Sequence, residues 1–301
     1  MPDSIIGQWV VLLGLGLLVS AVDADIASAK DLSGTVTLNL TVSSTTRAGD
    51  SLNVRTRQKM ARRAAPRIEK RLRSAGFKHL NAESRGNGDI FVEVGTSLSR
   101  MTILGFIIPE GRFEVRPIRS AGALWQRNSS RFPDGAELRQ PTGSLSRSDA
   151  YVWAPRRSDV ETVASELDLG IGLIRPYPDG DGWRTLVLGE PVLSTTDVEG
   201  ADIRPGHLGE PFVSVSLKGA AGQRLESKRQ DEQTRWAILL DGEVVSILDR
   251  QPSAFGVLNL SPPNHLGASE AQRRWARQVA ARISTPMPVR LVPIDTPSDD
   301  T

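Results

Sequence analysis

The sequence of 301 residues has no cysteine, only three histidines and an aromatic share of 5%. Without cysteine the chain forms no disulfide, no thiolate metal site and no cysteine nucleophile, although this does not fix its compartment. His79, His207 and His265 are far apart in the sequence, so no pair has the spacing of a helical metal motif. Few aromatic side chains also disfavour a surface on which nucleic-acid bases stack, and we expect no nucleic-acid partner.

Catalytic motifs are missing as well. The chain contains no H-E-x-x-H, no G-x-S-x-G and no Walker A loop. Gly170-Ile171-Gly172 is half of a dinucleotide fingerprint, but its third glycine is absent. Asp179 and Asp181 stand among glycines in a pattern typical of a turn, without the later carboxylate of a calcium loop. We therefore expect no catalytic residue, no cofactor and no bound metal, and a binding module rather than an enzyme.

The only long apolar run is Trp9–Val22, and its 14 residues suit a signal peptide better than the roughly 20 that cross a bilayer. Two small-x-small sites, ending at Ala21 and Ala29, fit signal cleavage, although no Lys or Arg precedes the run. If the apolar segment is counted from Ile5, it is long enough to be an uncleaved membrane anchor instead. A third alternative is that it forms a buried N-terminal helix or strand. Residues 1–29 are interpreted as a signal peptide or N-terminal anchor, which predicts a periplasmic protein, exported or tethered to the inner membrane.

Charge of the two signs is unevenly spread. Residues 1–157 carry 23 Lys and Arg against 14 Asp and Glu, whereas residues 158–301 carry 14 against 21. Such asymmetry suggests two units with different partners, or one charged face turned to a surface.

Much of the positive charge falls on a helix predicted over residues 55–75, where apolar residues recur at helical spacing and Gly76 stands at the C-cap. Ten Lys and Arg lie between Arg55 and Lys78, with Glu69 as the only acid. The basic face is either simply solvated or contacts anionic lipid headgroups or an acidic partner. The candidate residues for an anionic surface are Arg62, Arg63, Arg67, Lys70 and Arg71.

Alternating apolar residues predict a small sheet in the first part of the chain. A short helix is expected at 98–108, and strands are expected at 32–42, 89–94 and 112–118. The order β-α-β-α-β within residues 30–119 indicates a small open sheet with helices on one face. A last strand is expected at 288–295, before the polar tail 296–301.

Residues 120–158 are rich in Ser, Arg, Gly and Pro with little periodicity, and we expect an irregular connection there. Residues 159–287 follow as a second subdomain organised around the segment Trp236–Leu248. In this segment Asp241-Gly242 separates two apolar runs, which is a strong signal for a β-hairpin. Because both arms are almost continuously apolar, the hairpin should be covered on both faces.

The apolar stretch 255–260 has two interpretations. It is either a surface that contacts extended polypeptide or an ordinary strand of the second subdomain. The polypeptide-contact candidates are Phe255, Val257, Leu258 and Leu260.

Several sequence segments occur in a recognisable order. They are I-E-K-R-L-R-S-A-G-F (68–77), D-I-F-V-E-V (89–94), G-E-P-V-L (189–193), W-A-I-L-L-D-G-E-V-V-S (236–246) and M-P-V-R-L (287–291). Together they resemble the first periplasmic domain of SecD, of the SecDF protein-export family, over nearly all of residues 32–295. The resemblance implies an α+β fold with a ferredoxin-like base subdomain and an inserted mixed α+β head subdomain. The base would comprise residues 30–119, completed by the strand at 288–295, and the head would comprise residues 159–287.

The sequence also departs from that family. Ile247-Leu248 replaces the Ala-Pro that follows the hairpin serine, and Gln251–Leu260 replaces a glycine-rich loop. No segment resembling the family's membrane helices follows residue 295, so we expect any translocation role to be passive.

Two functional hypotheses result. In the first, the protein is an exported, non-catalytic, SecD-head-like module that contacts unfolded or translocating polypeptide or a translocon. In the alternative, it is an envelope structural or interaction protein that lies near anionic lipid and has no export role.

Overall fold

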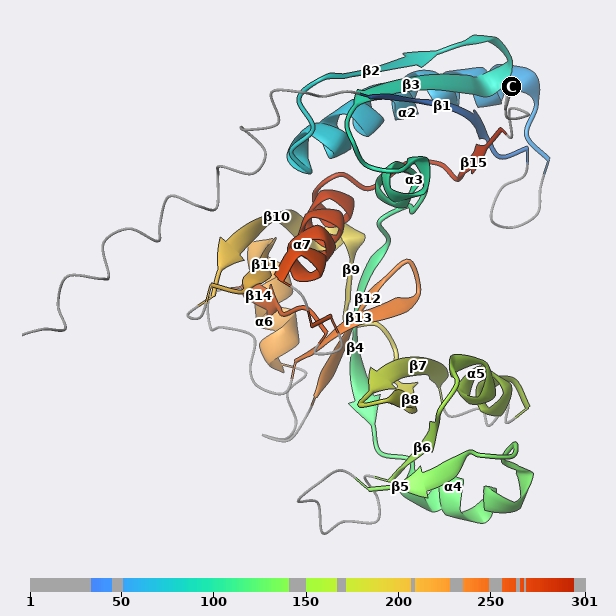
Figure 1. Ribbon diagram of the computed structural model, residues 1–301. Coiled ribbons are helices and arrows are strands. Elements are labelled where there is room, and N and C mark those ends of the chain that lie inside the picture. Colours follow the sequence, from blue (N-terminus) through green and yellow to red (C-terminus); the bar gives the residue numbers. More distant parts are fainter. Residues whose placement is uncertain are drawn as a thin grey trace, which may run out of the picture.

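The computed structural model describes residues 34–44, 51–140, 150–166, 172–206, 209–227, 235–248, 256–263, 266–267 and 269–294. The expected signal or anchor segment 1–29, Phe255 and the tail 296–301 lie outside these residues. The described elements form three stacked parts, with the N-terminal strands at the top of Figure 1, α7 and the hairpin in the middle, and the green elements below.

The first part is an antiparallel sheet with strand order β15-β1-β3-β2, covered by two helices. Its elements are β1 (Thr35–Val42), α2 (Val54–Ser74), β2 (Leu80–Ser84), β3 (Asp89–Gly95), α3 (Arg100–Ile107) and β15 (Leu291–Pro293). The connectivity is β-α-β-β-α-β, with the last strand supplied from the far end of the sequence. A strand, β15, lies within the segment 288–295 where one was expected, and it pairs with β1. We call this part the base layer.

Helix α2 forms because its local signals agree with its packing. The Asn53 side chain accepts a hydrogen bond from the Thr56 N–H at 2.9 Å, which is an N-cap. Gly76 has φ 97° and ends the helix in the left-handed conformation, as predicted. Pro66 lies inside the helix without ending it. The buried face of α2 packs on the inward-facing side chains of β1, and its apolar residues are Ala61, Ala64, Ala65, Ile68 and Leu72.

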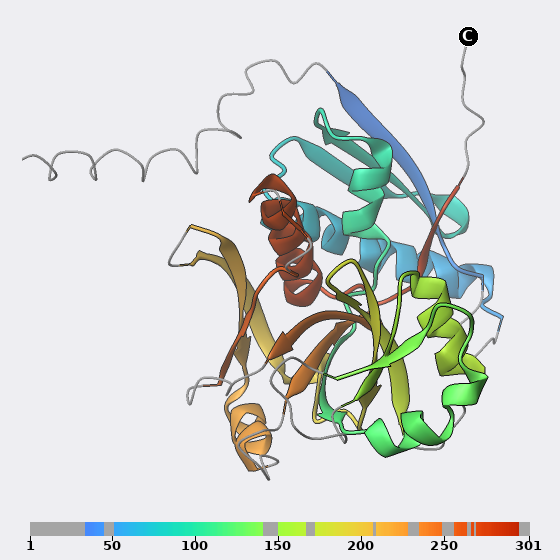
Figure 2. The ribbon, with the colours of Figure 1, turned by 60° about the horizontal axis from the view of Figure 1, so that its bottom comes forward.

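The second part is a large sheet with the order β13-β12-β4-β8-β6-β5, to which β7 is added through β8 and β9 through β4. Its strands are β4 (Phe113–Arg119), β5 (Glu137–Arg139), β6 (Tyr151–Ala154), β7 (Leu173–Asp179), β8 (Gly182–Leu188), β9 (Leu193–Ser194), β12 (Trp236–Leu240) and β13 (Glu243–Leu248). The sheet curls so that β7 comes into contact with β13, and Figure 2 shows the yellow-green strands beside the orange hairpin. Helices α4 (Gly122–Arg127) and α5 (Arg157–Glu166) pack on its β5–β8 end.

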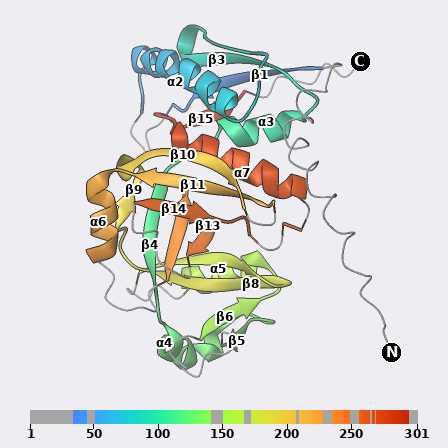
Figure 3. The same ribbon diagram turned by 90° about the vertical axis from the view of Figure 1, so that its left-hand side faces the viewer.

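The third part is a sheet with the order β10-β11-β14. Its elements are β10 (Val198–Pro205), β11 (Pro211–Leu217), α6 (Gly219–Ser227), β14 (Val257–Leu260) and α7 (Ser269–Ser284). Helix α7 contacts β10 and β11 on one side and both α2 and α3 on the other, so it joins this sheet to the base layer (Figure 3). Short 3₁₀ turns at Gly86–Gly88, Ser129–Arg131 and Thr195–Asp197 complete the described elements.

Strand β12 connects two hydrophobic cores. Trp236, Ile238 and Leu240 belong to a core shared with β11, β14, α6 and α7, whereas Ala237 and Leu239 belong to a core inside the curled sheet. All five residues are buried. The predicted turn is also present, because Asp241 and Gly242 have φ values of 58° and 84°, the positive values of a type I′ turn. The expectation of cover on both faces therefore holds for β12, while β13 is partly exposed.

The α+β class was correctly predicted, but the structure differs from the sequence-based description in two places. The strand expected at 112–118 is β4, and it pairs with β12, β8 and β9 in the second sheet instead of with β1 or β3. Alternation showed that it is a strand but could not show its partner, because the partner is far away in sequence. Residues 120–158 contain α4, β5 and β6, so the expected irregular connection is wrong for the described part. These elements are too short for their periodicity to be visible.

A substitution of Gly242 tests the turn. An added Cβ at Gly242 would meet nothing within 4 Å, so the cost of Gly242→Val comes only from its positive φ. We expect the free energy of unfolding to fall by about 1–3 kcal/mol, measured by urea denaturation. Gly200→Val is the matched control, because Gly200 also has open space but no positive φ. An equal loss in both variants would contradict the turn as the cause.

Candidate functional site

The strand proposed to contact polypeptide is part of a core. Leu258 and Leu260 on β14 lie opposite Val215 and Val213 of β11, and both leucines are 0% exposed. They are therefore not available to a ligand, and the prediction is wrong for these two residues. Val257 is half-buried, and Phe255 is outside the described residues. An apolar run bounded by turns is typical both of a core strand and of a contact surface. The sequence therefore could not decide between these two interpretations of residues 255–260.

Four of the five candidates for an anionic surface are exposed on α2, namely Arg62, Arg63, Arg67 and Lys70. Arg67 also donates from Nη1 to the carbonyl oxygen of Pro286 at 2.8 Å. The single acid of the helix, Glu69, has a different role, because it accepts a hydrogen bond from the Ala82 N–H on the outer edge of β2 at 3.1 Å.

Arg71 is the exception, and its assignment to an exposed surface is wrong. It is 0% exposed and its guanidinium group points into the molecule. It donates to the carbonyl oxygens of Thr285 (2.9 Å), Phe106 (3.2 Å), Ile107 (3.3 Å), Glu110 (3.1 Å) and Pro109. A signal for this was present in the sequence, since Arg71 lies seven residues after Ala64 and three after Ile68, at the spacing of the buried face.

The carbonyl groups that Arg71 binds come from the ends of two helices. Those of Phe106 and Ile107 belong to the last turn of α3, and that of Thr285 directly follows α7. Carbonyl groups at helix C-termini lack partners within the helix and carry a partial negative charge, which a guanidinium group satisfies. Burial lowers the pKa of Arg71 to about 9; repulsion from Arg282 adds to this and attraction to Asp241 opposes it. Arg71 is therefore still positively charged at neutral pH.

Arg71 also joins the two connections between the base layer and the rest of the chain. One runs from α3 to β4 through residues 108–112, and the other runs from α7 to β15 through residues 285–290. The Met287 N–H donates to the Glu110 carbonyl oxygen at 2.6 Å. At Gly111, with φ 78°, an added Cβ would lie 2.2 Å from the Arg282 carbonyl oxygen, so only glycine permits this approach.

We call the place where Arg71 meets these two connections the junction. The hairpin turn is hydrogen-bonded to it as well. The Asp241 N–H donates to the Arg112 carbonyl oxygen, and Asp241 Oδ1 accepts from the Arg112 N–H, both at 2.8 Å. Asp241 Oδ2 forms an ion pair with the Arg282 guanidinium group of α7. Asp241 was expected only to form the turn, and the structure adds a link between β4 and α7.

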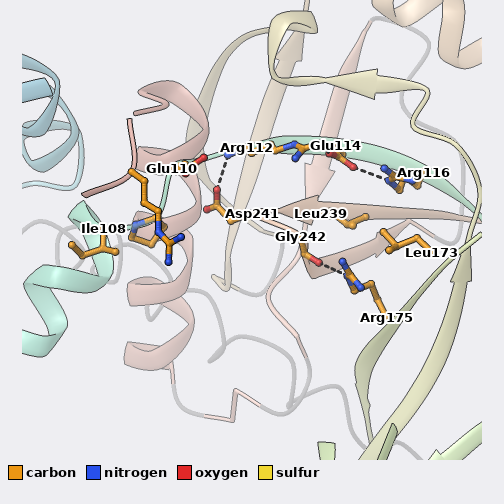
Figure 4. A pocket seen from close by; sticks show the side chains of 12 residues that line it. Ile108, Glu110, Arg112, Glu114, Arg116, Leu173, Arg175, Leu239, Asp241 and Gly242 are labelled. Carbon is orange, nitrogen blue, oxygen red and sulfur yellow. Dashed lines mark hydrogen bonds and ion pairs between the residues drawn. The ribbon is translucent and has the colours of Figure 1, made fainter. Parts of the chain in front are cut away.

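A cleft of about 550 Å³ opens beside this junction, between the base layer and the curled sheet. Figure 4 shows Arg112, Glu114 and Arg116 in a row along β4, with Leu173 and Arg175 of β7 opposite. The remaining walls come from the connections and the hairpin, and are formed by Ile108, Pro109, Glu110, Leu239, Asp241, Gly242 and Arg290. The volume lies within the usual range of ligand sites. This cleft was not predictable from the sequence, because its lining residues come from four separate segments.

A second hollow of about 340 Å³ adjoins the first, since both are lined by Glu110, Arg112 and Glu114. Its other walls include Ser194, Thr195 and Met287. The two hollows therefore form one continuous depression that extends on both sides of the first residues of β4.

No group of three or more His, Asp and Glu side chains within the described residues is arranged to hold a metal ion. In the same part of the chain, no helix has both the length and the apolar character needed to span a bilayer.

The arrangement of layers is that of a known fold. The fold is that of a SecD/SecDF-like domain, as the sequence resemblance implied. In comparison with solved structures, the chain is similar to SecDF in a super-membrane-facing form, with a TM-score of 0.50 and 19% identity, over 87% of this chain and 30% of that one. It is also similar to a SecDF structure described as a membrane component that enhances protein export, with a TM-score of 0.48 and 18% identity, over 87% of this chain and 99% of that one.

At these identities the likeness concerns the fold alone. The chain spans 30% of the length of the first SecDF structure. No protein-family model and no curated protein sequence matches it.

Replacing Arg71 tests the junction. Arg71→Met retains most of the apolar stem but removes five buried or partly buried hydrogen bonds to carbonyl groups, so we expect the free energy of unfolding to fall by about 3 kcal/mol or more. Arg67→Met, on the same helix, removes one exposed hydrogen bond and should cost about 1 kcal/mol or less. Urea denaturation of both variants measures the difference. A comparable small loss in both would show that Arg71 does not stabilise the junction.

Proposed function

We propose that the chain is an exported, non-catalytic binding module with a SecD-like role in protein export. In this role it contacts unfolded or translocating polypeptide, or a translocon, on the periplasmic side of the inner membrane. The observation that carries the proposal is the SecDF-like fold over 87% of the chain. The cleft between the base layer and the curled sheet supports it, because it offers a place for a bound chain.

Suppression of aggregation tests polypeptide binding. A reduced, unfolded client is diluted into buffer with increasing amounts of the protein, and light scattering is followed with time. We expect scattering to be delayed and its final level lowered in proportion to the protein added, since a bound chain is withheld from aggregation. An equal mass of a folded protein of similar charge is the control. No delay at a severalfold excess would count against the proposal.

The alternative role, at an anionic membrane surface, is favoured by the exposed face of α2. Arg71 is turned inward and Glu69 is engaged with β2, but an exposed row of cations remains, formed by Arg55, Lys59, Arg62, Arg63, Lys70 and Arg73. Each cation near an anionic surface contributes roughly 1 kcal/mol at most, and salt screens the attraction.

Vesicle flotation tests this alternative. Binding to vesicles containing anionic phospholipid should fall severalfold when Arg62, Arg63 and Lys70 are replaced by Glu, and it should weaken as salt rises. A matched variant replaces three exposed arginines elsewhere, Arg127, Arg131 and Arg204, by Glu. It has the same net charge, so equal losses in both variants would indicate only a general charge effect.

A further inference from the structure

Three carboxylates and four arginines line the cleft, and two of the carboxylates, Glu114 and Asp241, have cationic partners. Glu114 is 8% exposed, and its Oε1 lies 2.6 Å from Nη2 of Arg112 while its Oε2 lies 2.7 Å from Nε of Arg116. Asp241 uses one oxygen for the Arg112 N–H and the other for Arg282. Both acids are thus neutralised within the protein and hold arginine side chains in place.

The arginines of the cleft are in excess over these acids. Arg175 donates from Nε to the Gly242 carbonyl oxygen at 2.9 Å and from Nη1 to the Ile174 carbonyl oxygen at 3.1 Å, and both acceptors are uncharged. Arg290, which also lines the cleft, has an exposed side chain. The side chain of Arg112 is 56% exposed although it is paired with Glu114. The cleft therefore presents positive charge to a ligand from three different segments.

The positions of these arginines are set by the fold. Arg112 directly precedes β4, Arg175 lies on β7 and is held to the hairpin turn, and Arg290 precedes β15 in the base layer. A guanidinium group that is already oriented loses little freedom when it binds a carboxylate, and it can bind one with two parallel hydrogen bonds.

The walls between the charges are apolar. Ile108, Leu173 and Leu239 line the main hollow, and the adjoining hollow extends the site past Arg112. A small inorganic anion would leave these walls uncovered. An extended chain covers them and places an acidic side chain among the arginines.

We propose that this cleft binds an extended polypeptide segment through an acidic side chain, with Arg112, Arg175 and Arg290 as the recognising cations. The inference rests on the proposed polypeptide-binding function and specifies its site and its ligand chemistry.

Fluorescence anisotropy with labelled unstructured peptides tests the inference. Three peptides share one apolar framework and carry Asp and Glu, Asn and Gln, or Lys at the same positions. We expect the acidic peptide to bind about tenfold more tightly than the neutral one, and the Lys peptide to bind most weakly. The preference should shrink as salt rises.

Two single variants locate the site. Arg290→Gln and Arg112→Gln should each weaken binding of the acidic peptide by about five- to tenfold and change binding of the neutral peptide by less than about twofold. Arg127→Gln and Arg204→Gln remove the same charge from exposed positions outside the cleft and should leave both peptides unaffected. Circular dichroism and urea denaturation verify that all four variants are folded.

The outcomes separate this inference from the function on which it rests. Equal binding of acidic and neutral peptides, or no difference between the cleft variants and the controls, would overturn the cleft inference and leave polypeptide binding intact. No binding of any peptide together with no suppression of aggregation would overturn the proposed function itself. Displacement of the acidic peptide by millimolar inorganic phosphate, with no binding of the neutral peptide, would show a site for small anions instead.

Discussion

The position of the base layer depends on one buried cation. Arg71 lies on the inner face of α2, yet its hydrogen bonds go to the ends of α3 and α7 and to the connection that leads to β4. A buried charge costs several kcal/mol unless its donors are satisfied, and backbone carbonyl groups satisfy this one without adding a second charge. The arrangement requires α2, α3 and α7 to be present together, so the base layer and the rest of the chain stabilise each other.

The other two parts are joined through strand β12. Its side chains alternate between two cores, with Ile238 on one side and Leu239 on the other. Its turn brings Asp241 to Arg112 and Arg282, next to the Arg71 junction. The cleft lies between the base layer and this hairpin, so its walls are formed by the most firmly connected segments. A rigid frame of this kind keeps the arginines of the cleft in fixed positions.

At two sheet edges in the molecule, a side chain binds the backbone of one residue. Glu69 accepts from the Ala82 N–H at the edge of β2, and the Ser284 hydroxyl group both donates to and accepts from the backbone of Ala201 at the edge of β10. A protein that meets unfolded chains is exposed to unwanted strand addition, and occupied edge groups oppose it.

The sequence by itself determined the local features. The α2 helix with its Gly76 end, the Asp241-Gly242 turn and the buried β12 strand were all predictable, because residues close in sequence fix helical spacing, caps and turns. The α+β class also followed, from the order of segments that resemble SecD. Only the tertiary structure decided the partner of β4, the inward direction of Arg71, the burial of Leu258 and Leu260, and the cleft. Each of these depends on contacts between segments up to two hundred residues apart, and a residue's type and local period carry no information about which distant segment will cover it.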